Sequence, residues 1–256
     1  KMEISAKELL EGKSTIIKNK EYFPTKTYVE PFFEKMSKIT DEFIIQVKEA
    51  DQMSVTKDTK DMVYNRVWIQ AVLPEKYTVD NHKEVYGLVY GLDARKPVAK
   101  IYRGTLNMAC LNLCIFDPDW LTVQELQPDA PINFGPLKEL VEKENNMHTI
   151  IQNMKNEYMI REDHKLHLGE WVDFTLRQYD DRGFGKVQMA SSVPINAYKD
   201  IYINSDSKYF IPEGINPTKF QIYNAFTELI THDKRDILNV ADKTLLLGKM
   251  LNVSPY

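Results

Sequence analysis

The sequence contains only two cysteines, no long apolar run and no excess of basic residues over its 256 positions. Two cysteines are too few for the disulfide framework that holds many small secreted domains together. The longest apolar stretches, such as 85–92 and 245–247, are far shorter than the roughly 20 residues of a transmembrane helix. No apolar run follows the basic start of the chain, so we expect neither a secretion signal nor a membrane-bound protein.

The spacing of the cysteines and histidines does not predict a metal site. Cys110 and Cys114 are separated by three residues, whereas zinc and redox motifs commonly use the closer Cys-x-x-Cys spacing. We expect both cysteines to be buried, reduced and equivalent to small hydrophobic residues in a reducing cytoplasm. His164 and His167 lack the spacing that places two imidazoles on one helix face, and residues 162–167 are interpreted as a solvated connector. The sequence therefore predicts no metal and no cofactor.

The charge balance is mildly acidic, with a formal net charge of −4 and a pI near 5.8. A dedicated duplex-DNA-binding protein usually carries a basic excess, so this balance argues against that role but leaves room for a local basic groove. The hydrophobic share of 43% and the charged share of 27% are those of an ordinary globular protein, so a full core is expected. Titratable residues form no recognisable catalytic motif, and we therefore expect no enzymatic activity.

A period-two alternation of apolar and polar residues runs through positions 42–104 and predicts a meander of at least four antiparallel strands. Between 63 and 73, one face of the predicted strand carries residues that should be buried, namely Val63, Val67 and Ile69. The segment 93–97 is rich in turn-forming residues and predicts a hairpin turn between the next two strands. Residues 187–211 are expected to contain further short strands.

Pro136 marks a change to helical periodicity. From there to Tyr158, apolar residues recur every three or four positions, with Glu144 as a polar exception. This spacing predicts one long amphipathic helix that runs unbroken past Met154 and packs on the sheet.

Further helices are expected towards the C-terminus, one opening at Asn216-Pro217 and a last one ending at Leu251. The sheet-rich part of the chain then spans 42–115, and the helix-rich part spans 136–256. This order predicts a single α+β domain over residues 1–256, in which an antiparallel β-meander is covered by the long helix and the C-terminal helices.

Aromatic and basic side chains are interleaved on the predicted sheet. An antiparallel sheet that carries aromatic rings among cations can stack the bases and track the phosphates of single-stranded nucleic acid. The alternative is that this face packs under the helix from Pro136, with the rings in the core and the cations reaching out to solvent. The predicted nucleic-acid-binding residues are Tyr64, Arg66, Trp68, Tyr86, Tyr90, Arg95, Lys96, Lys100, Tyr102 and Arg103.

Several segments together resemble a known family. Residues 87–92, 96–102 and 109–113, with the C-terminal segment 222–232, resemble a pattern in phage- and plasmid-borne proteins known as domain of unknown function 932. This chain has Cys110-Leu111-Asn112 where members of that family usually have Cys-Thr-Asn. The resemblance implies a mobile-element protein that works in the bacterial cytoplasm, in replication, recombination or counter-defence. The family has no established active site to carry over.

Two functional hypotheses follow from these patterns. The first is a phage-type accessory protein that binds single-stranded nucleic acid in replication or recombination and could act as a homo-oligomer. The alternative is a host-interaction (counter-defence) protein that binds and inhibits a host protein complex, for which an acidic balance suits mimicry of nucleic acid. The exposure of Trp68 and Tyr90 distinguishes them, because a ring that stacks on bases must be accessible.

Overall fold

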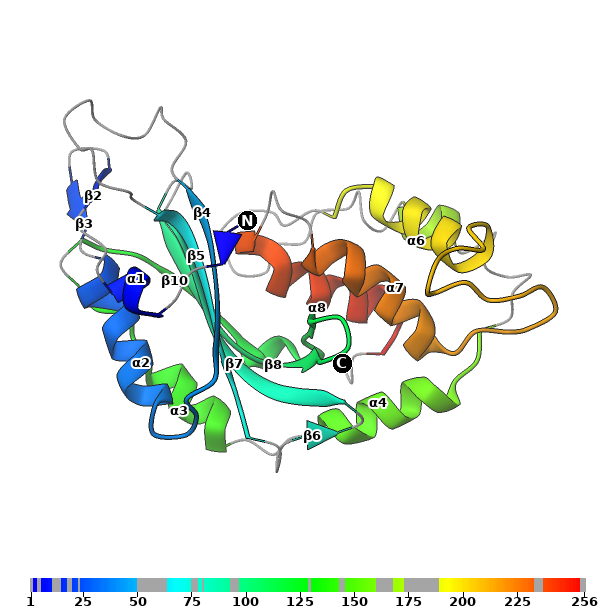
Figure 1. Ribbon diagram of the computed structural model, residues 1–256, viewed down its shortest axis with the longest axis horizontal. Helices are drawn as coiled ribbons and strands as arrows, with labels where there is room; N and C mark the ends of the chain where they lie inside the picture. The colour runs from blue at the N-terminus through cyan, green and yellow to red at the C-terminus, as the bar shows by residue number, and fades with distance from the viewer. Residues whose placement is uncertain are drawn as a thin grey trace. The chain divides into compact units, whose positions relative to one another are not determined.

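The structure, a computed structural model, comprises two compact units (Figure 1). The first unit contains residues 1–104, 120–143 and 234–238, and the second contains 105–119, 144–233 and 239–256. The chain therefore passes repeatedly between the two units. The residues that the structure describes are 2–3, 6–10, 15–17, 20–22, 24–49, 64–74, 78–79, 81–92, 97–128, 130–142, 146–159, 168–172, 189–232 and 237–253.

The principal sheet has the strand order β1-β4-β5-β7-β8-β10, with β6 beside β7 and β9 beside β8. The β4–β5 and β5–β7 pairs are antiparallel, so the antiparallel sheet and the α+β class predicted from the sequence are confirmed. A separate hairpin joins β2 (Thr15–Ile17) and β3 (Lys20–Tyr22). The strands of the principal sheet are β1 (Met2–Glu3), β4 (Phe43–Glu49), β5 (Tyr64–Val72), β6 (Thr78–Val79), β7 (His82–Gly91), β8 (Val98–Asn107), β9 (Asn112–Cys114) and β10 (Leu121–Glu125).

Strand β5 is buried on both of its faces. Residues directly opposite one another on antiparallel strands point to the same side of the sheet. Val67 lies opposite Tyr90, and Trp68 lies opposite Val89, so Trp68 and Tyr90 point to opposite faces. All of these side chains are buried, as is Ile69. The predicted burial of Val67 and Ile69 is confirmed, and Val63 lies outside the described residues.

Helices of the first unit cover the face that carries Tyr90. They are α1 (Ala6–Leu10), the π-helical turn η1 (Thr25–Val29), α2 (Glu30–Met36) and α3 (Gly135–Glu142). The ring of Tyr28 in η1 meets Tyr90 edge-on with centroids 5.7 Å apart. Phe33 of α2 meets Phe43 of β4 at 4.7 Å. These edge-to-face contacts show that this face belongs to the core of the unit.

The prediction of one long helix after Pro136 is wrong. Helix α3 ends at Glu142, and a separate helix, α4 (Met147–Asn156), begins in the second unit. Asn146 precedes α4 with φ −94° and ψ 8°, outside the helical region. Asparagine has a low helix propensity, and Asn146 makes no side-chain cap hydrogen bond, so the break is seen in its backbone conformation. Leu137 in α3 and Met154 in α4 are each buried, although they do not share one helix.

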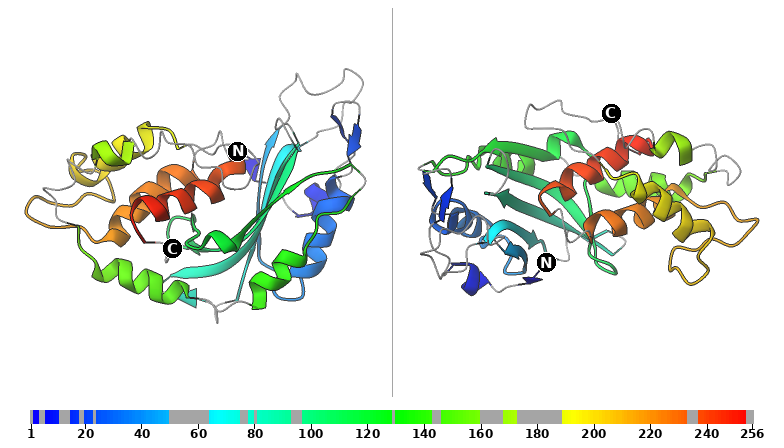
Figure 2. Two further views of the ribbon diagram at one scale, coloured as in Figure 1. Left: turned by 180° about the vertical axis from the view of Figure 1, so that it is seen from behind. Right: turned by 90° about the horizontal axis from the view of Figure 1, so that it is seen from above.

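The second unit is mainly helical. Besides α4 it contains α6 (Ser192–Tyr202), α7 (Lys219–Thr231) and α8 (Val240–Met250), with short 3-10 turns η3 (Pro118–Trp120) and η4 (Ile237–Asn239) at its borders. Helices α7 and α8 lie side by side (Figure 2). Helix α7 begins with a complete capping box between Thr218 and Gln221, two residues later than the predicted Asn216-Pro217 start.

The short strands expected in 187–211 are replaced by helix α6, whose Ala197 and Ile201 are buried. Ala197 and Ile201 are four residues apart, a spacing that places them on one face of a helix. The β-branched residues in the same segment favoured strands, and the structure shows that the helical spacing prevails. Within the described segments, no helix has the length and hydrophobicity that crossing a bilayer requires.

The close approach of Tyr102 to Gly87 generates a stability prediction. A Cβ atom added at Gly87 would overlap the Tyr102 ring, whose hydroxyl accepts hydrogen bonds from Trp68 Nε1 and Gln70 Nε2. Because the ring is held on that side, Gly87→Ala should lower the free energy of unfolding by about 1–3 kcal/mol in urea denaturation. The control is Gly169→Ala, an exposed helical position with no atom within 4 Å. If both variants were as stable as wild type, the ring packing described here would be wrong.

Candidate functional site

The aromatic residues predicted to bind nucleic acid do not form one surface. Trp68 donates to the Tyr102 hydroxyl, so these two rings lie on the Gly87 face of the sheet. Tyr86 and Tyr90 point to the opposite face, under η1 and α2. All four rings are buried, so these aromatic residues do not form an open stacking platform.

Those of the predicted cations that the structure describes are also buried or half-buried. Arg103 is buried and its Nε donates to Glu84 Oε1 at 2.6 Å, and its guanidinium lies 5.5 Å from the centre of the Trp120 ring. Lys100 is buried too, and Arg66 is half-buried. Arg95, Lys96 and the side chain of Tyr64 lie outside the described residues. Nucleic-acid binding itself stays a prediction, but the exposed aromatic and basic sheet face on which it was based is not formed by these residues.

A different feature stands out in the second unit, at the hairpin between β8 and β9. Asn107 lies opposite Asn112, and four residues connect them: Met108, Ala109, Cys110 and Leu111, here called the hairpin tip. The carbonyl of Asn107 accepts from the amides of Cys110 and Leu111 at 3.2 and 2.6 Å, and its side chain accepts from Ala109 N at 3.0 Å. These bonds give the tip a defined conformation.

Leu111 adopts a left-handed backbone conformation with φ +55° and is 37% exposed. A branched side chain in this region is uncommon, because Cβ crowds the following carbonyl oxygen; glycine and asparagine usually occupy such positions. Tight hairpin turns are usually rich in glycine, asparagine and aspartate, whereas every residue of this tip is apolar. Local turn chemistry therefore does not account for the residues found here.

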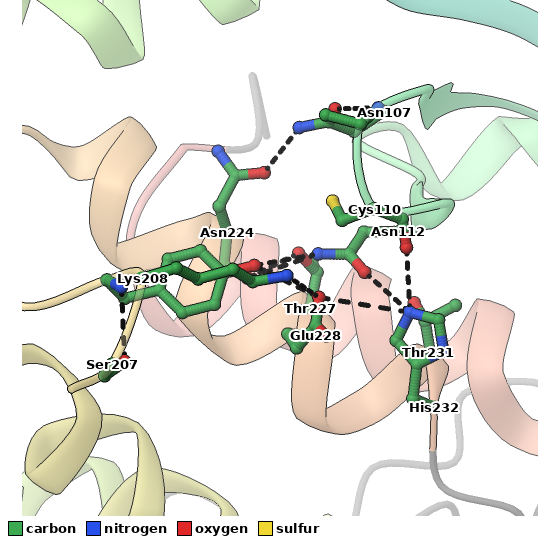
Figure 3. A network of polar contacts seen from close by, with 12 residues as sticks. Asn107, Cys110, Asn112, Ser207, Lys208, Asn224, Thr227, Glu228, Thr231 and His232 are labelled. Carbon is green, nitrogen blue, oxygen red and sulfur yellow. Dashed lines mark hydrogen bonds and ion pairs between the residues drawn. The ribbon is translucent and has the colours of Figure 1, made fainter.

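Helix α7 holds the hairpin through a polar face that is buried. Asn224, Thr227 and Thr231 lie on this face. Asn107 Nδ2 donates to Asn224 Oδ1 at 3.2 Å, and the backbone amide of Leu113 donates to Thr231 Oγ1 at 3.1 Å (Figure 3). On this side of β9, the Thr231 hydroxyl of α7 thus takes the hydrogen-bonding position that a neighbouring strand would occupy.

His232, directly after α7, reaches the tip itself. Its Nε2 lies 2.8 Å from the carbonyl oxygen of Cys110 and 3.2 Å from Asn112 Oδ1. The amide nitrogen of Asn112 faces the carbonyl of Asn224 at 3.4 Å, which assigns Oδ1 to the histidine. Both partners of Nε2 are acceptors, so Nε2 must carry a proton. Nε2 of the ring therefore acts as a donor that secures the hairpin.

Glu228 connects the same helix to the loop 203–217. Its Oε2 accepts from the Tyr209 hydroxyl and from Lys208 Nζ, both at 3.1 Å, and it lies 3.9 Å from His232 Nε2. The Tyr209 hydroxyl in turn lies 3.5 Å from Asn112 Nδ2. Burial alone would raise the pKa of Glu228, but the Lys208 hydrogen bond and the charge of His232 lower it below its usual value.

Cys110 is not activated by these neighbours. Partial burial raises the pKa of its thiol, in spite of the hydrogen bond from the Asn112 backbone. The sulfur points away from His232 in Figure 3, and His232 contacts the carbonyl of this residue instead. Cys114 is buried as predicted, whereas Cys110 is only half-buried and belongs to the tip, so the prediction of two core cysteines is wrong for it. Such an arrangement does not support a nucleophilic cysteine.

The polar groups of this cluster bond mainly to one another, which is the property of a structural support. Among the described residues, no group of three or more histidines, cysteines or carboxylates could hold a metal ion. What the arrangement can do is present the hairpin tip to solvent in a fixed conformation. Sequence reasoning singled out 109–113 and 222–232 only for their family resemblance, and the structure places them side by side. The sequence feature that could have indicated this contact is the presence of polar residues among apolar neighbours, at Asn112, Asn224 and Thr231.

Comparison with known proteins adds no family: no protein-family model, no curated protein and no solved structure matches the chain.

Replacing Asn112 by Ala should destabilise the second unit. This fully buried amide bonds with groups of Asn224, Tyr209 and His232, and its loss removes these bonds and leaves a cavity in their place. We expect a loss of about 1–3 kcal/mol in the free energy of unfolding. Asn196→Ala, at an exposed position of α6, is the matched control and should change stability by less than about 0.5 kcal/mol. Equal stability of the two variants would show that the network does not support the hairpin.

The ion pair of Glu228 predicts that the difference in stability between wild type and Glu228→Gln depends on pH. A carboxylate whose folded pKa is lowered adds stability that is fully present above its unfolded pKa, roughly pH 4, and is lost as the pH falls through the lower folded value. Glu228→Gln should therefore unfold at lower urea concentration than wild type at pH 7, and the difference should shrink on acidification. Glu213→Gln, at an exposed position in the loop 203–217, is the control. A difference that stays constant with pH would contradict the assignment.

Proposed function

We propose that this chain is a non-catalytic accessory protein that binds another protein through its hairpin tip. The observation that carries the proposal is the exposed, left-handed Leu111 in an all-apolar tip. A left-handed non-glycine residue costs about 1–2 kcal/mol and persists only where its surroundings impose it. Here α7 and His232 supply that constraint through bonds to both ends of the hairpin. Stabilising an unfavourable exposed conformation is reasonable where the exposed side chain has a binding role.

The chemistry of the tip also supports a protein partner. Methionine and aliphatic side chains are adaptable contact residues, and exposed apolar groups held rigidly lose little entropy on binding. The buried Trp68 and Tyr90 remove the stacking surface on which the nucleic-acid hypothesis depended. In the setting that the family resemblance implies, the partner would be a host protein complex that the chain inhibits.

Leu111→Asn should abolish capture of the partner without loss of stability. Asparagine tolerates a positive φ, so the free energy of unfolding should stay equal or rise by up to about 1 kcal/mol. The matched control is Leu10→Asn, because Leu10 is a leucine of similar exposure, 40%, in the first unit. The measurement is quantitative affinity capture from cells that carry the gene, comparing wild type and both variants.

A protein captured by wild type and by Leu10→Asn, and lost with Leu111→Asn, is the expected result. A parallel fluorescence-anisotropy titration with a labelled single-stranded oligonucleotide at low salt tests the other hypothesis. Saturable oligonucleotide binding that Leu111→Asn weakens, with no protein lost from the capture, would replace the proposal by nucleic-acid binding.

A further inference from the structure

Strand β10 of the first unit has an outer side with which none of the described strands pairs. It is the last strand in the order of the sheet and lies beside β8. The amide of Leu126, just after β10, donates to the carbonyl of Pro97 at 2.9 Å. Bonded and non-bonded pairs alternate along an antiparallel ladder, so every second residue before Leu126 is bonded to β8 in the same way. The backbone N–H and C=O groups of Val123 and Glu125, at the intervening positions, therefore point away from β8.

The accessible stretch of this edge is short and has defined limits. Past the end of β10, Gln127 pairs with Ala130 and the chain turns back. Gln124 points to the face that α3 covers, where its amide group holds the backbone of Asn133 through bonds of 2.6 and 2.9 Å. The returning segment thus leaves the edge for that face of the sheet. The stretch available to another strand is therefore centred on Val123.

The edge of β10 also lacks the features by which proteins usually block an edge strand, which are proline, lysine, a bulge or a very short strand. On the opposite side of the same sheet, β1 has only two residues and β4 shifts its register at Lys48. Strand β10 reads Leu-Thr-Val-Gln-Glu, with two β-branched residues and neither proline nor lysine. Residues 122–124 are half-buried, so their side chains are within reach of a partner. Of the two outer sides of the described sheet, the one formed by β10 is open to pairing.

We propose that two copies of this chain pair through β10, antiparallel and about a two-fold axis at Val123. In this register Val123 lies opposite its own counterpart, Leu121 lies opposite Glu125, and Thr122 lies opposite Gln124. Paired β-branched side chains stabilise neighbouring strands, and no charge faces a like charge. An axis at Glu125 would pair fewer residues and would bring the two carboxylates together. The sequence of β10 is therefore complementary to itself in one register.

This geometry also sets the size and strength of the assembly. Because the other side of the sheet is blocked, pairing stops at two copies, in the closed symmetry that most homo-oligomers have. Pairing of the five residues of β10 buries much less than the area of about 800 Å² per partner that stable interfaces use. The dimer is therefore weak and forms at high protein concentration. The inference does not depend on the proposed function, since the hairpin tip belongs to the second unit.

Sedimentation equilibrium of the full chain over about a hundredfold range of concentration tests the proposal. The weight-average mass should rise from that of one chain towards that of two. Val123→Pro removes the outward N–H and with it both hydrogen bonds of the central pair, but no donor to β8. Proline is tolerated at such a position of an edge strand, so the melting temperature should change little. We expect association to weaken by about tenfold or more.

Val123→Cys tests the register even if the proline variant does not fold. The two-fold axis brings the two introduced thiols together, so oxidation with copper phenanthroline should give a covalent dimer. Thr122→Cys, which faces Gln124 across the axis, should give much less, and wild type, with its own two cysteines, should give none.

A wild-type chain that stays monomeric at every concentration would overturn the proposal. So would a dimer that Val123→Pro does not weaken and Val123→Cys does not crosslink, because another surface would then be responsible. Growth beyond two copies would contradict the closed pairing of β10.

Discussion

The candidate site depends on one buried amide, the side chain of Asn112. A buried amide is stable only if its donors and acceptor all find partners, and here the partners come from three separate parts of the second unit. The nitrogen faces the backbone of α7 and the Tyr209 hydroxyl of the loop 203–217, and the oxygen faces His232. The amide of Asn112 therefore links the hairpin, the helix and the loop through one buried group.

The first unit is organised around a different constraint, a sheet that must be buried on two sides. Aromatic rings fill both faces, and the buried Arg103 pairs with Glu84 and lies beside the rings of Trp120 and Tyr86. Removing both charges from water is costly, so close geometry and the additional hydrogen bond from the Tyr86 hydroxyl are needed to offset it. Cations among aromatic residues can thus mark a paired core site as well as a nucleic-acid surface.

Sequence periodicity predicted the parts of the fold that depend on local alternation. The antiparallel sheet, the burial of Val67 and Ile69, and the amphipathic stripe of Leu137 and Met154 follow from residue spacing alone. Two features of the fold, the end of a helix and the sheet face of two tyrosines, could not be predicted from residue spacing. The break before Met147, where Asn146 leaves the helical conformation, interrupts a continuing apolar period. The face on which Tyr86 and Tyr90 lie depends on strand register, and a shift of one residue exchanges the two faces.

The candidate site was less accessible to prediction, because its residues are about 120 positions apart in the chain and meet only through the fold. No local pattern indicates that His232 will bond to the backbone of Cys110, or that Leu111 will adopt a positive φ. Polar residues within apolar segments, such as Asn112 and Thr231, were the only indication of this site in the sequence. Buried polar side chains need partners, and a partner at long range often marks the contact between two elements.

The hydroxyl of Thr231 has a consequence for how the protein behaves at high concentration. An unpaired strand edge is a template on which strands of other molecules can add, leading to aggregation. At β9 the outward amide of Leu113 already bonds to this hydroxyl, 3.1 Å away, so the helix closes the edge with a side chain in place of a strand. The second unit thereby protects a three-residue strand from intermolecular pairing while leaving the apolar turn beside it in contact with solvent.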